Sequence, residues 1–178
     1  PKMWRRNKVS EFNGGIVETL DGGKTWKPVS AQIGEGAMTH ILMDPSSDKS
    51  SRILYACAFG KGVYKSLDGG KTWQQKNNGI TGKEPFAWRI IRRETDGVLF
   101  LIVNRRSDDG SIGNELDGAL YRSDDGAETW RKISLPEGSN APMGLALDPE
   151  HPGRLIMSAW GRVTPELFSP DIGGGIFV

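Results

Sequence analysis

Acidic side chains that could do acid–base chemistry gather in two long polar segments of the chain. Residues 104–117 hold Asp108, Asp109 and Glu115, and residues 161–174 hold Glu166 and Asp171. Two carboxyl groups that face each other across a cleft, one of them with a raised pKa, can act as a general acid and a base or nucleophile. These five carboxylates are therefore the candidate catalytic residues, and the sequence does not say which two would pair.

Cationic and aromatic side chains lie in or next to the same two segments. Arg105 and Arg106 open the first segment, and Trp160 and Arg162 lie at the start of the second. Guanidinium groups donate hydrogen bonds to polar oxygens, and a flat ring at the rim of a site could stack on a sugar. We expect any ligand held by this chain to contact these residues, because binding residues concentrate on loops held by a rigid scaffold. The alternatives are surface insertions without a role and a Trp160 packed between sheets.

A motif of eight residues occurs three times, at 19–26 (TLDGGKTW), 66–73 (SLDGGKTW) and 123–130 (SDDGAETW). The aspartates of the three copies lie 47 and 57 residues apart, which indicates a repeat architecture with room for four short strands in each unit. In a tight turn, the hydroxyl and the carboxylate two residues later can both accept backbone N–H groups, while glycine supplies positive φ. The motif therefore predicts a hairpin turn, after which the tryptophan returns to an apolar layer. The residues given this structural role are Asp21, Asp68, Asp125, Trp26, Trp73 and Trp130.

The repeated aspartates could instead be catalytic acids or metal ligands. Turn carboxylates are usually occupied by local hydrogen bonds, and three equivalent acids on three separate units cannot converge on one substrate. His40, expected on a strand, and His151, expected in a turn, have no partner at ligand or triad spacing. We therefore expect neither a metal nor a cofactor.

The repeat resembles the Asp-box (BNR) family, whose motif is Ser/Thr-x-Asp-x-Gly-x-Thr-Trp. All three copies match, although the third has Ala127-Glu128 where the others have Gly-Lys. The resemblance implies a β-propeller in which each box lies between the third and fourth strands of a blade, away from the ligand-binding face. The surrounding consensus looks most like xyloglucanase-type propellers and BNR-repeat glycosyl hydrolases, and similar boxes occur in sortilin-like receptors.

Short alternating segments around the boxes predict the strands. For the unit around the second box they are 38–44, 53–59, 62–66 and 72–76; for the third, 86–93, 98–104, 119–123 and 129–134. The predicted fold class is all-β: a β-propeller of four-stranded antiparallel blades, this chain being a slice of about three blades of a larger propeller. The expected blade pieces within one domain, 1–178, are 1–34, 35–78, 79–138 and 139–178. Remaining blades would come from the same longer chain or another chain.

Composition agrees with this fold and limits the partners. The chain has 24 glycines, 10 prolines and 37% hydrophobic residues, and no stretch long and apolar enough to span a membrane. The net charge of +1 creates no field that would recruit nucleic acid, so Arg92 and Arg93 are expected on solvated faces. The single Cys57 is expected to pack as a small hydrophobic residue.

Three function classes remain. The favoured one is a binding or scaffold module for a glycan or protein partner, and the alternative is a glycoside hydrolase with paired carboxylates. A sialidase is the third, because Trp88-Arg89-Ile90-Ile91 resembles the sialidase motif Tyr/Phe-Arg-Ile-Pro, with Ile91 in place of proline. A sialidase also needs an arginine triad, which this sequence does not assemble. The resemblance implies a secreted, periplasmic or extracellular protein.

Overall fold

The computed structural model describes residues 14–34, 36–104, 118–137, 139, 141–159 and 175–177, which form strands, turns and connecting segments. The first strands are β1 (Val17–Glu18), β2 (Lys27–Pro28), β3 (Met38–Met43), β4 (Leu54–Ala58), β5 (Gly62–Ser66) and β6 (Gln74–Gln75). They are followed by β7 (Ala87–Arg92), β8 (Leu99–Val103), β9 (Ala119–Ser123), β10 (Arg131–Ile133), β11 (Pro142–Leu147), β12 (Leu155–Ala159) and β13 (Gly175–Phe177). The described part of the chain contains no helix that could cross a membrane.

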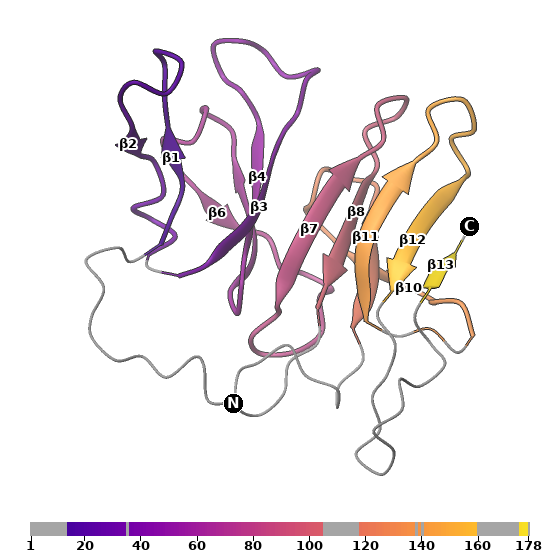
Figure 1. Ribbon diagram of the computed structural model, residues 1–178. Helices are drawn as coiled ribbons and strands as arrows, with labels where there is room; N and C mark the ends of the chain where they lie inside the picture. Colours follow the sequence, from indigo (N-terminus) through magenta and orange to yellow (C-terminus); the bar gives the residue numbers. More distant parts are fainter. Residues whose placement is uncertain are drawn as a thin grey trace.

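The strands form four antiparallel sheets that stand side by side in chain order (Figure 1). Two sheets have four strands each, β3-β4-β5-β6 and β7-β8-β9-β10, and every strand pairs with the next one along the chain. The pair β1-β2 precedes them and the sheet β11-β12-β13 follows them. The predicted all-β fold with four-stranded antiparallel blades is confirmed.

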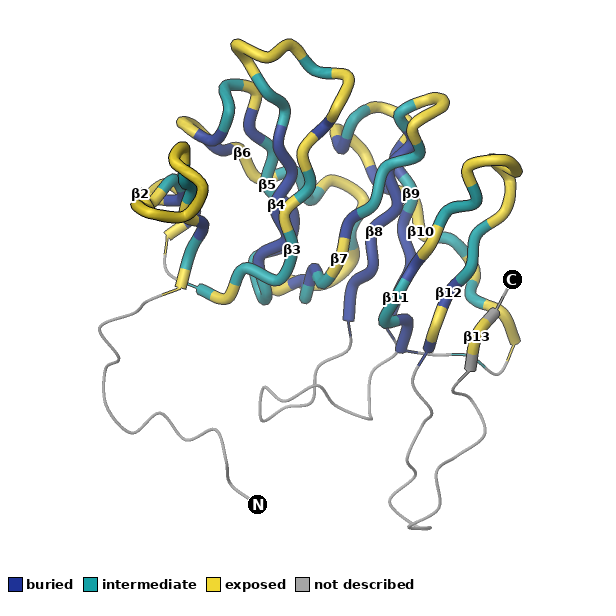
Figure 2. Tube along the Cα trace, turned by 45° about the horizontal axis from the view of Figure 1, so that its top comes forward, coloured by how far each residue is buried: buried dark blue, intermediate teal, exposed yellow. Residues whose placement is uncertain are grey.

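Hydrophobic side chains fill the spaces between neighbouring sheets. The second strand of each complete sheet is buried along its whole length, since β4 reads LYACA and β8 reads LFLIV (Figure 2). One cluster joins Tyr55 and Cys57 to Ile90 and Tyr121 of the next sheet. Cys57 is fully buried, which raises the pKa of its thiol and confirms that it packs as a small hydrophobic residue. Burial of this kind contributes about 1.5–3 kcal/mol for each large aliphatic side chain.

Each box segment lies in the turn between the last two strands of its sheet, as predicted: β1-β2, β5-β6 and β9-β10. In the second box the Ser66 hydroxyl accepts the Gly70 N–H at 2.8 Å, and Asp68 accepts the N–H and the hydroxyl of Thr72 at 2.8 and 2.6 Å. The hydrogen bonds from the box threonine lower the pKa of Asp68 to about 2. Thr25 does the same for Asp21, and Thr129 for Asp125.

The third box keeps the same turn although alanine replaces glycine. Ala127 has a φ of 72°, in the region that normally favours glycine. Its N–H still donates to the Ser123 hydroxyl at 2.9 Å. The turn geometry is therefore set by the hydroxyl and the carboxylate and tolerates one alanine.

The box tryptophans differ in burial. Trp73 and Trp130 are 7% and 4% exposed, whereas Trp26 is 58% exposed. Trp73 and Trp130 pack against the sheet that precedes their own, and no described sheet precedes β1-β2. The expected apolar surroundings are therefore found for Trp73 and Trp130 and not for Trp26.

The prediction that Arg92 and Arg93 lie on solvated faces is wrong. Their side chains are only 12% and 15% exposed. Arg92 Nε lies 3.3 Å from the Asp44 carboxylate, which follows the first strand of the preceding sheet. Arg93 forms a pair with Asp96 at 2.7 Å in the β7-β8 turn. Pairing with carboxylates allows both charges to leave bulk water.

Candidate functional site

The strand registers define two ends of the sheets. Ala87, Val103 and Ala119 lie next to one another at one end of the third sheet, and Arg92, Leu99 and Ser123 at the other. We call the first the loop end, because residues 105–117 connect β8 to β9 there and residues 160–174 connect β12 to β13. The box segments lie at the opposite end, the box end.

The predicted site residues fall in these two connections. They are Asp108, Asp109, Glu115, Glu166, Asp171, Trp160, Arg105, Arg106 and Arg162, and all lie outside the described residues. Their catalytic and ligand-binding roles stay predictions. The described residues locate the points at which the two connections leave and rejoin the sheets.

These anchor points are brought together between neighbouring sheets. The buried Asn104 amide, at the end of β8, donates to Met143 Sδ on β11 at 3.4 Å. A Cβ added to Gly118, before β9, would lie 2.7 Å from the Pro142 ring, so the two backbones touch. Pro142 in turn pairs with Ala159, which precedes the second connection. The two connections therefore start from adjacent points at the loop end.

A β-bulge occurs at the same place in three consecutive sheets. The register of the first strand shifts around Thr39 in β3, Trp88 in β7 and Met143 in β11. The Thr39 hydroxyl donates to the Ala87 carbonyl at 2.8 Å, which links the second and third sheets. Bulges redirect side chains and are frequent near functional sites. The sequence analysis did not find this feature, because a single extra residue leaves the alternating pattern almost unchanged.

His40 and Arg89 follow two of these bulges on strands that contact each other. Burial, and then the positive charge of Arg89, lower the pKa of His40. Its Nδ1 is buried and has no hydrogen-bond partner among the described residues. Arg89 is exposed. The pair therefore offers a neutral imidazole and a cationic donor near the loop end. The sequence alone gave His40 no partner at ligand or triad spacing, so it did not indicate Arg89 as a neighbour.

Three half-buried aromatic rings also lie at the loop end. Phe59, after β4, meets Phe86 of the next sheet edge-to-face with centroids 4.3 Å apart, and Trp88 is 6.3 Å from Phe59. Phe59 precedes a glycine at the end of a second strand, as Trp160 does in its own repeat. That parallel is the sequence signal for an aromatic position at this end of two units, whereas the unit between them has Asn104 at the same position.

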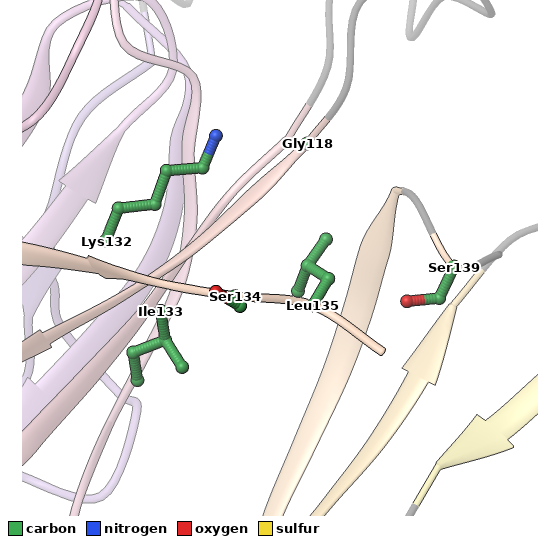
Figure 3. A pocket seen from close by; sticks show the side chains of 6 residues that line it. All are labelled: Gly118, Lys132, Ile133, Ser134, Leu135 and Ser139. Carbon is green, nitrogen blue, oxygen red and sulfur yellow. The ribbon is translucent and has the colours of Figure 1, made fainter. Parts of the chain in front are cut away.

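A pocket of about 470 Å³ lies beside Gly118 at the loop end (Figure 3). Its lining residues are Gly118, Lys132, Ile133, Ser134, Leu135 and Ser139. They come from the residue before β9, from β10 and from the segment that leads to β11. The described residues contain no group of three or more His, Cys, Asp or Glu side chains placed to hold a metal ion.

The sheets, their order and their matching bulges define part of a β-propeller. No protein-family model and no curated protein matches the sequence. The structure is similar to the GH74 enzyme of Niastella koreensis, with a TM-score of 0.61, 24% identity, and coverage of 82% of this chain and 22% of that one. It is also similar to the GH74 xyloglucanase from Xanthomonas campestris, with a TM-score of 0.60, 20% identity, and coverage of 86% and 24%. At this identity the similarity shows the fold, and the chain spans about a quarter of these proteins.

Proposed function

We propose that this chain is part of a β-propeller that binds a glycan at the loop end of its sheets, with xyloglucan as the first polysaccharide to test. The observation that carries the proposal is the convergence of two long polar connections, anchored at Asn104, Gly118 and Ala159, on one end of neighbouring sheets. The similarity to GH74 structures, one of them described as a xyloglucanase, supplies the ligand class.

The residue types at this end suit carbohydrate recognition. Sugars present flat apolar faces and many hydroxyl groups, so they are held by aromatic rings together with amide, carboxylate and guanidinium groups. The described loop end supplies Phe59, Trp88 and the exposed Arg89. The connections add Trp160, Arg105, Arg106 and Arg162 as predicted contacts.

Glycoside hydrolysis is the second candidate, because both structural neighbours are GH74 proteins. A hydrolase needs one carboxyl group that keeps its proton near neutral pH. The box aspartates do not meet this need, since hydrogen bonds lower the pKa of Asp68 to about 2. An acid and its partner would come from the five predicted carboxylates, namely Asp108, Asp109, Glu115, Glu166 and Asp171.

A sialidase activity has less support. It would need arginines free to hold a substrate carboxylate, and Arg92 and Arg93 are paired with Asp44 and Asp96. Arg89 alone, of the Trp88-Arg89-Ile90-Ile91 sequence, is exposed.

Calorimetric titration of the parent chain with xyloglucan oligosaccharides tests the proposal, with a reducing-sugar assay on the same samples. We expect saturable binding, weakened at least tenfold by Trp160→Ala. Trp26→Ala, at an exposed position of the box end, is the matched control and should bind as the parent does. An increase in reducing ends in these samples would show that the chain also hydrolyses the oligosaccharide. Absence of binding to xyloglucan and to other neutral glycans would contradict the proposal and favour a protein partner.

A further inference from the structure

Three equivalent positions, one in each of three consecutive sheets, follow the β-bulges at the loop end. They are His40 in β3, Arg89 in β7 and Gly144 in β11. β7 contacts β3 on one side and β11 on the other, so the three positions lie at one level of neighbouring first strands (Figure 1). The Thr39 hydroxyl donates to the Ala87 carbonyl at 2.8 Å and joins β3 to β7 beside them.

The side chains of His40 and Arg89 face the sheet that follows their own. Residues paired directly across neighbouring strands share one face of the sheet. His40 pairs with Cys57, which packs against the sheet β7-β8-β9-β10. Arg89 pairs with Ile102, which packs against the sheet β11-β12-β13. The imidazole is therefore directed toward the strand that carries Arg89, and the guanidinium toward β11.

The Arg89 guanidinium has no protein partner in the described part of the chain, and the residue is exposed. Every other arginine that the structure describes bonds to a carbonyl or a carboxylate; these are Arg52, Arg92, Arg93, Arg122, Arg131 and Arg154. On the next sheet, Gly144 has no side chain to cover Arg89. The hydroxyl oxygen of the exposed Ser158 lies 2.7 Å from the place where a Cβ of Gly144 would be.

His40 supplies a hydrogen-bond donor beside this guanidinium. Its Nδ1 is the only buried side-chain nitrogen or oxygen of the described residues that lacks a hydrogen-bond partner, so Nε2, which has no partner there either, is not buried. Burial, and then the charge of Arg89, lower the pKa of the imidazole, which is therefore neutral at pH 7. A neutral ring carries one N–H, and proteins tolerate an unpaired buried acceptor more often than an unpaired buried N–H. The proton therefore lies on Nε2, toward solvent.

These groups donate hydrogen bonds, and only one of them carries a charge. A guanidinium presents its N–H groups in a planar fork that can hold two oxygens of one anion. The imidazole N–H and the Ser158 hydroxyl add donors from the two neighbouring sheets. Because one cation balances one negative charge, a carboxylate or a sulfate ester matches this arrangement better than a doubly charged phosphate does.

We propose that His40, Arg89 and Ser158 bind a singly charged oxyanion, a carboxylate or a sulfate ester, that is carried by a sugar ring. The sugar as carrier rests on the proposed function. Phe59 comes two residues after Cys57, the partner of His40. An extended chain rises about 3.3 Å per residue, so the aromatic rings of the loop end begin about 7 Å from the anion. The site therefore favours acidic over neutral sugars.

The test is an NMR titration of the complete 178-residue chain with methyl glucuronide, the 6-sulfate of methyl glucoside, and uncharged methyl glucoside. The chain has two histidines, so the ring signals of His40 are assigned by their loss in His40→Phe. We expect at least one acidic sugar to shift these signals with saturation, and methyl glucoside to bind at least tenfold more weakly. The acidic sugar that saturates at the lower concentration identifies the anionic group.

Substitutions assign the binding to individual side chains. Arg89→Ala should weaken binding of the acidic sugar at least tenfold, and Arg89→Lys several-fold, because lysine keeps the charge and loses the fork. His40→Phe should weaken binding several-fold without lowering the melting temperature, since it removes the donor together with the unpartnered Nδ1. Arg131→Ala, at an arginine of β10 whose side chain is 60% exposed, is the matched control and should bind as the parent does.

Three results would overturn the proposal: equal binding of methyl glucoside and the acidic sugars, no saturable shift with either acidic sugar, or parental binding by Arg89→Ala. Acetate separates the sugar from its charge. If acetate binds as tightly as the acidic sugars, the site holds a free small anion, and the assignment to a sugar is wrong.

The proposed function and this inference fail on different measurements. A failed titration with xyloglucan, which is neutral, together with Arg89-dependent binding of an acidic sugar would contradict the choice of a neutral glycan and leave this inference standing. Binding of xyloglucan without any response to the acidic sugars would contradict this inference alone.

Discussion

At the scale of single residues, each box aspartate is a structural carboxylate whose ionisation is linked to the turn it holds. Asp68 accepts from both the N–H and the hydroxyl of Thr72, and these bonds lower its pKa to about 2. A carboxyl group with a lowered pKa in the folded state stabilises that state at pH values above its unfolded pKa near 3.8. The stabilisation is lost as the pH falls through about 2.

We therefore expect Asp68→Asn to lower the melting temperature at pH 7, because asparagine cannot accept both bonds as a carboxylate does. The difference from the parent should shrink as the pH falls from about 4 to about 2, where Asp68 itself becomes protonated. Thermal melts between pH 2 and pH 7 measure this. A difference that stays constant over the whole range would show that ionisation of Asp68 does not hold the turn.

Two box tryptophans, the buried Trp73 and the exposed Trp26, allow the free energy of packing an indole to be compared. Trp73→Ala should destabilise the chain by about 3–5 kcal/mol, because a buried indole is removed and its space cannot be refilled. Trp26→Ala should cost less than about 0.5 kcal/mol, since that ring is 58% exposed while Trp73 is 7% exposed. Urea unfolding of both variants measures the two values. Equal costs would contradict the packing described for the two rings.

At the scale of elements, neighbouring sheets are joined by side chains as well as by the apolar core. Glu128 is held between Lys65 and Lys76, and it replaces the lysine found at the same position in the other two boxes. Its carboxylate is half exposed, so the pair of contacts contributes modestly.

Glu128→Lys would place three cations together at this junction. We expect a loss of about 1 kcal/mol in the free energy of unfolding in dilute buffer. High salt should reduce the loss, because it screens repulsion between exposed charges. Unfolding of parent and variant at low salt and at 1 M salt checks this. A salt-independent loss would point to altered backbone geometry at the neighbouring Ala127 instead.

The strands were largely predictable because their residues alternate around turns that only a few residue types can form. The ranges 62–66 and 119–123 coincide with β5 and β9, and the box positions follow from the hydroxyl, carboxylate and glycine spacing. Contacts between sheets were not predictable. The pairing of Arg92 with Asp44 joins residues 48 positions apart, and the exposure of Trp26 depends on which sheet precedes it.

The candidate site was predictable only to the level of its position. Strand order assigns both long connections to one end of the sheets, and the described anchors at Asn104, Gly118 and Ala159 agree with that assignment. The pairing of carboxylates depends on loop conformation, which no periodic pattern encodes. The bulges before His40 and Arg89 were missed for a related reason, since one unpaired residue leaves no periodic signal.

At the scale of the whole molecule, four sheets side by side form one part of a propeller with two different ends (Figure 1). The box end is occupied by turns whose polar groups bond to one another, as in Thr25 and Asp21. The loop end carries the bulges, the aromatic rings and both long connections. We therefore assign the structural turns to the box end and the proposed ligand-binding face to the loop end.

One binding measurement tests that claim most directly. Charge-neutralising substitutions at the loop end, Asp108→Asn, Asp109→Asn, Glu166→Gln and Asp171→Asn, are compared with Glu150→Gln and Asp124→Asn, outside the two connections, in titrations with the same xyloglucan oligosaccharide. We expect at least one loop-end substitution to weaken binding tenfold or more with a nearly unchanged melting temperature, and the comparison variants to bind as the parent does. Parental binding by all four loop-end variants, together with loss of binding in the comparison variants, would contradict the assignment of the ligand to the loop end.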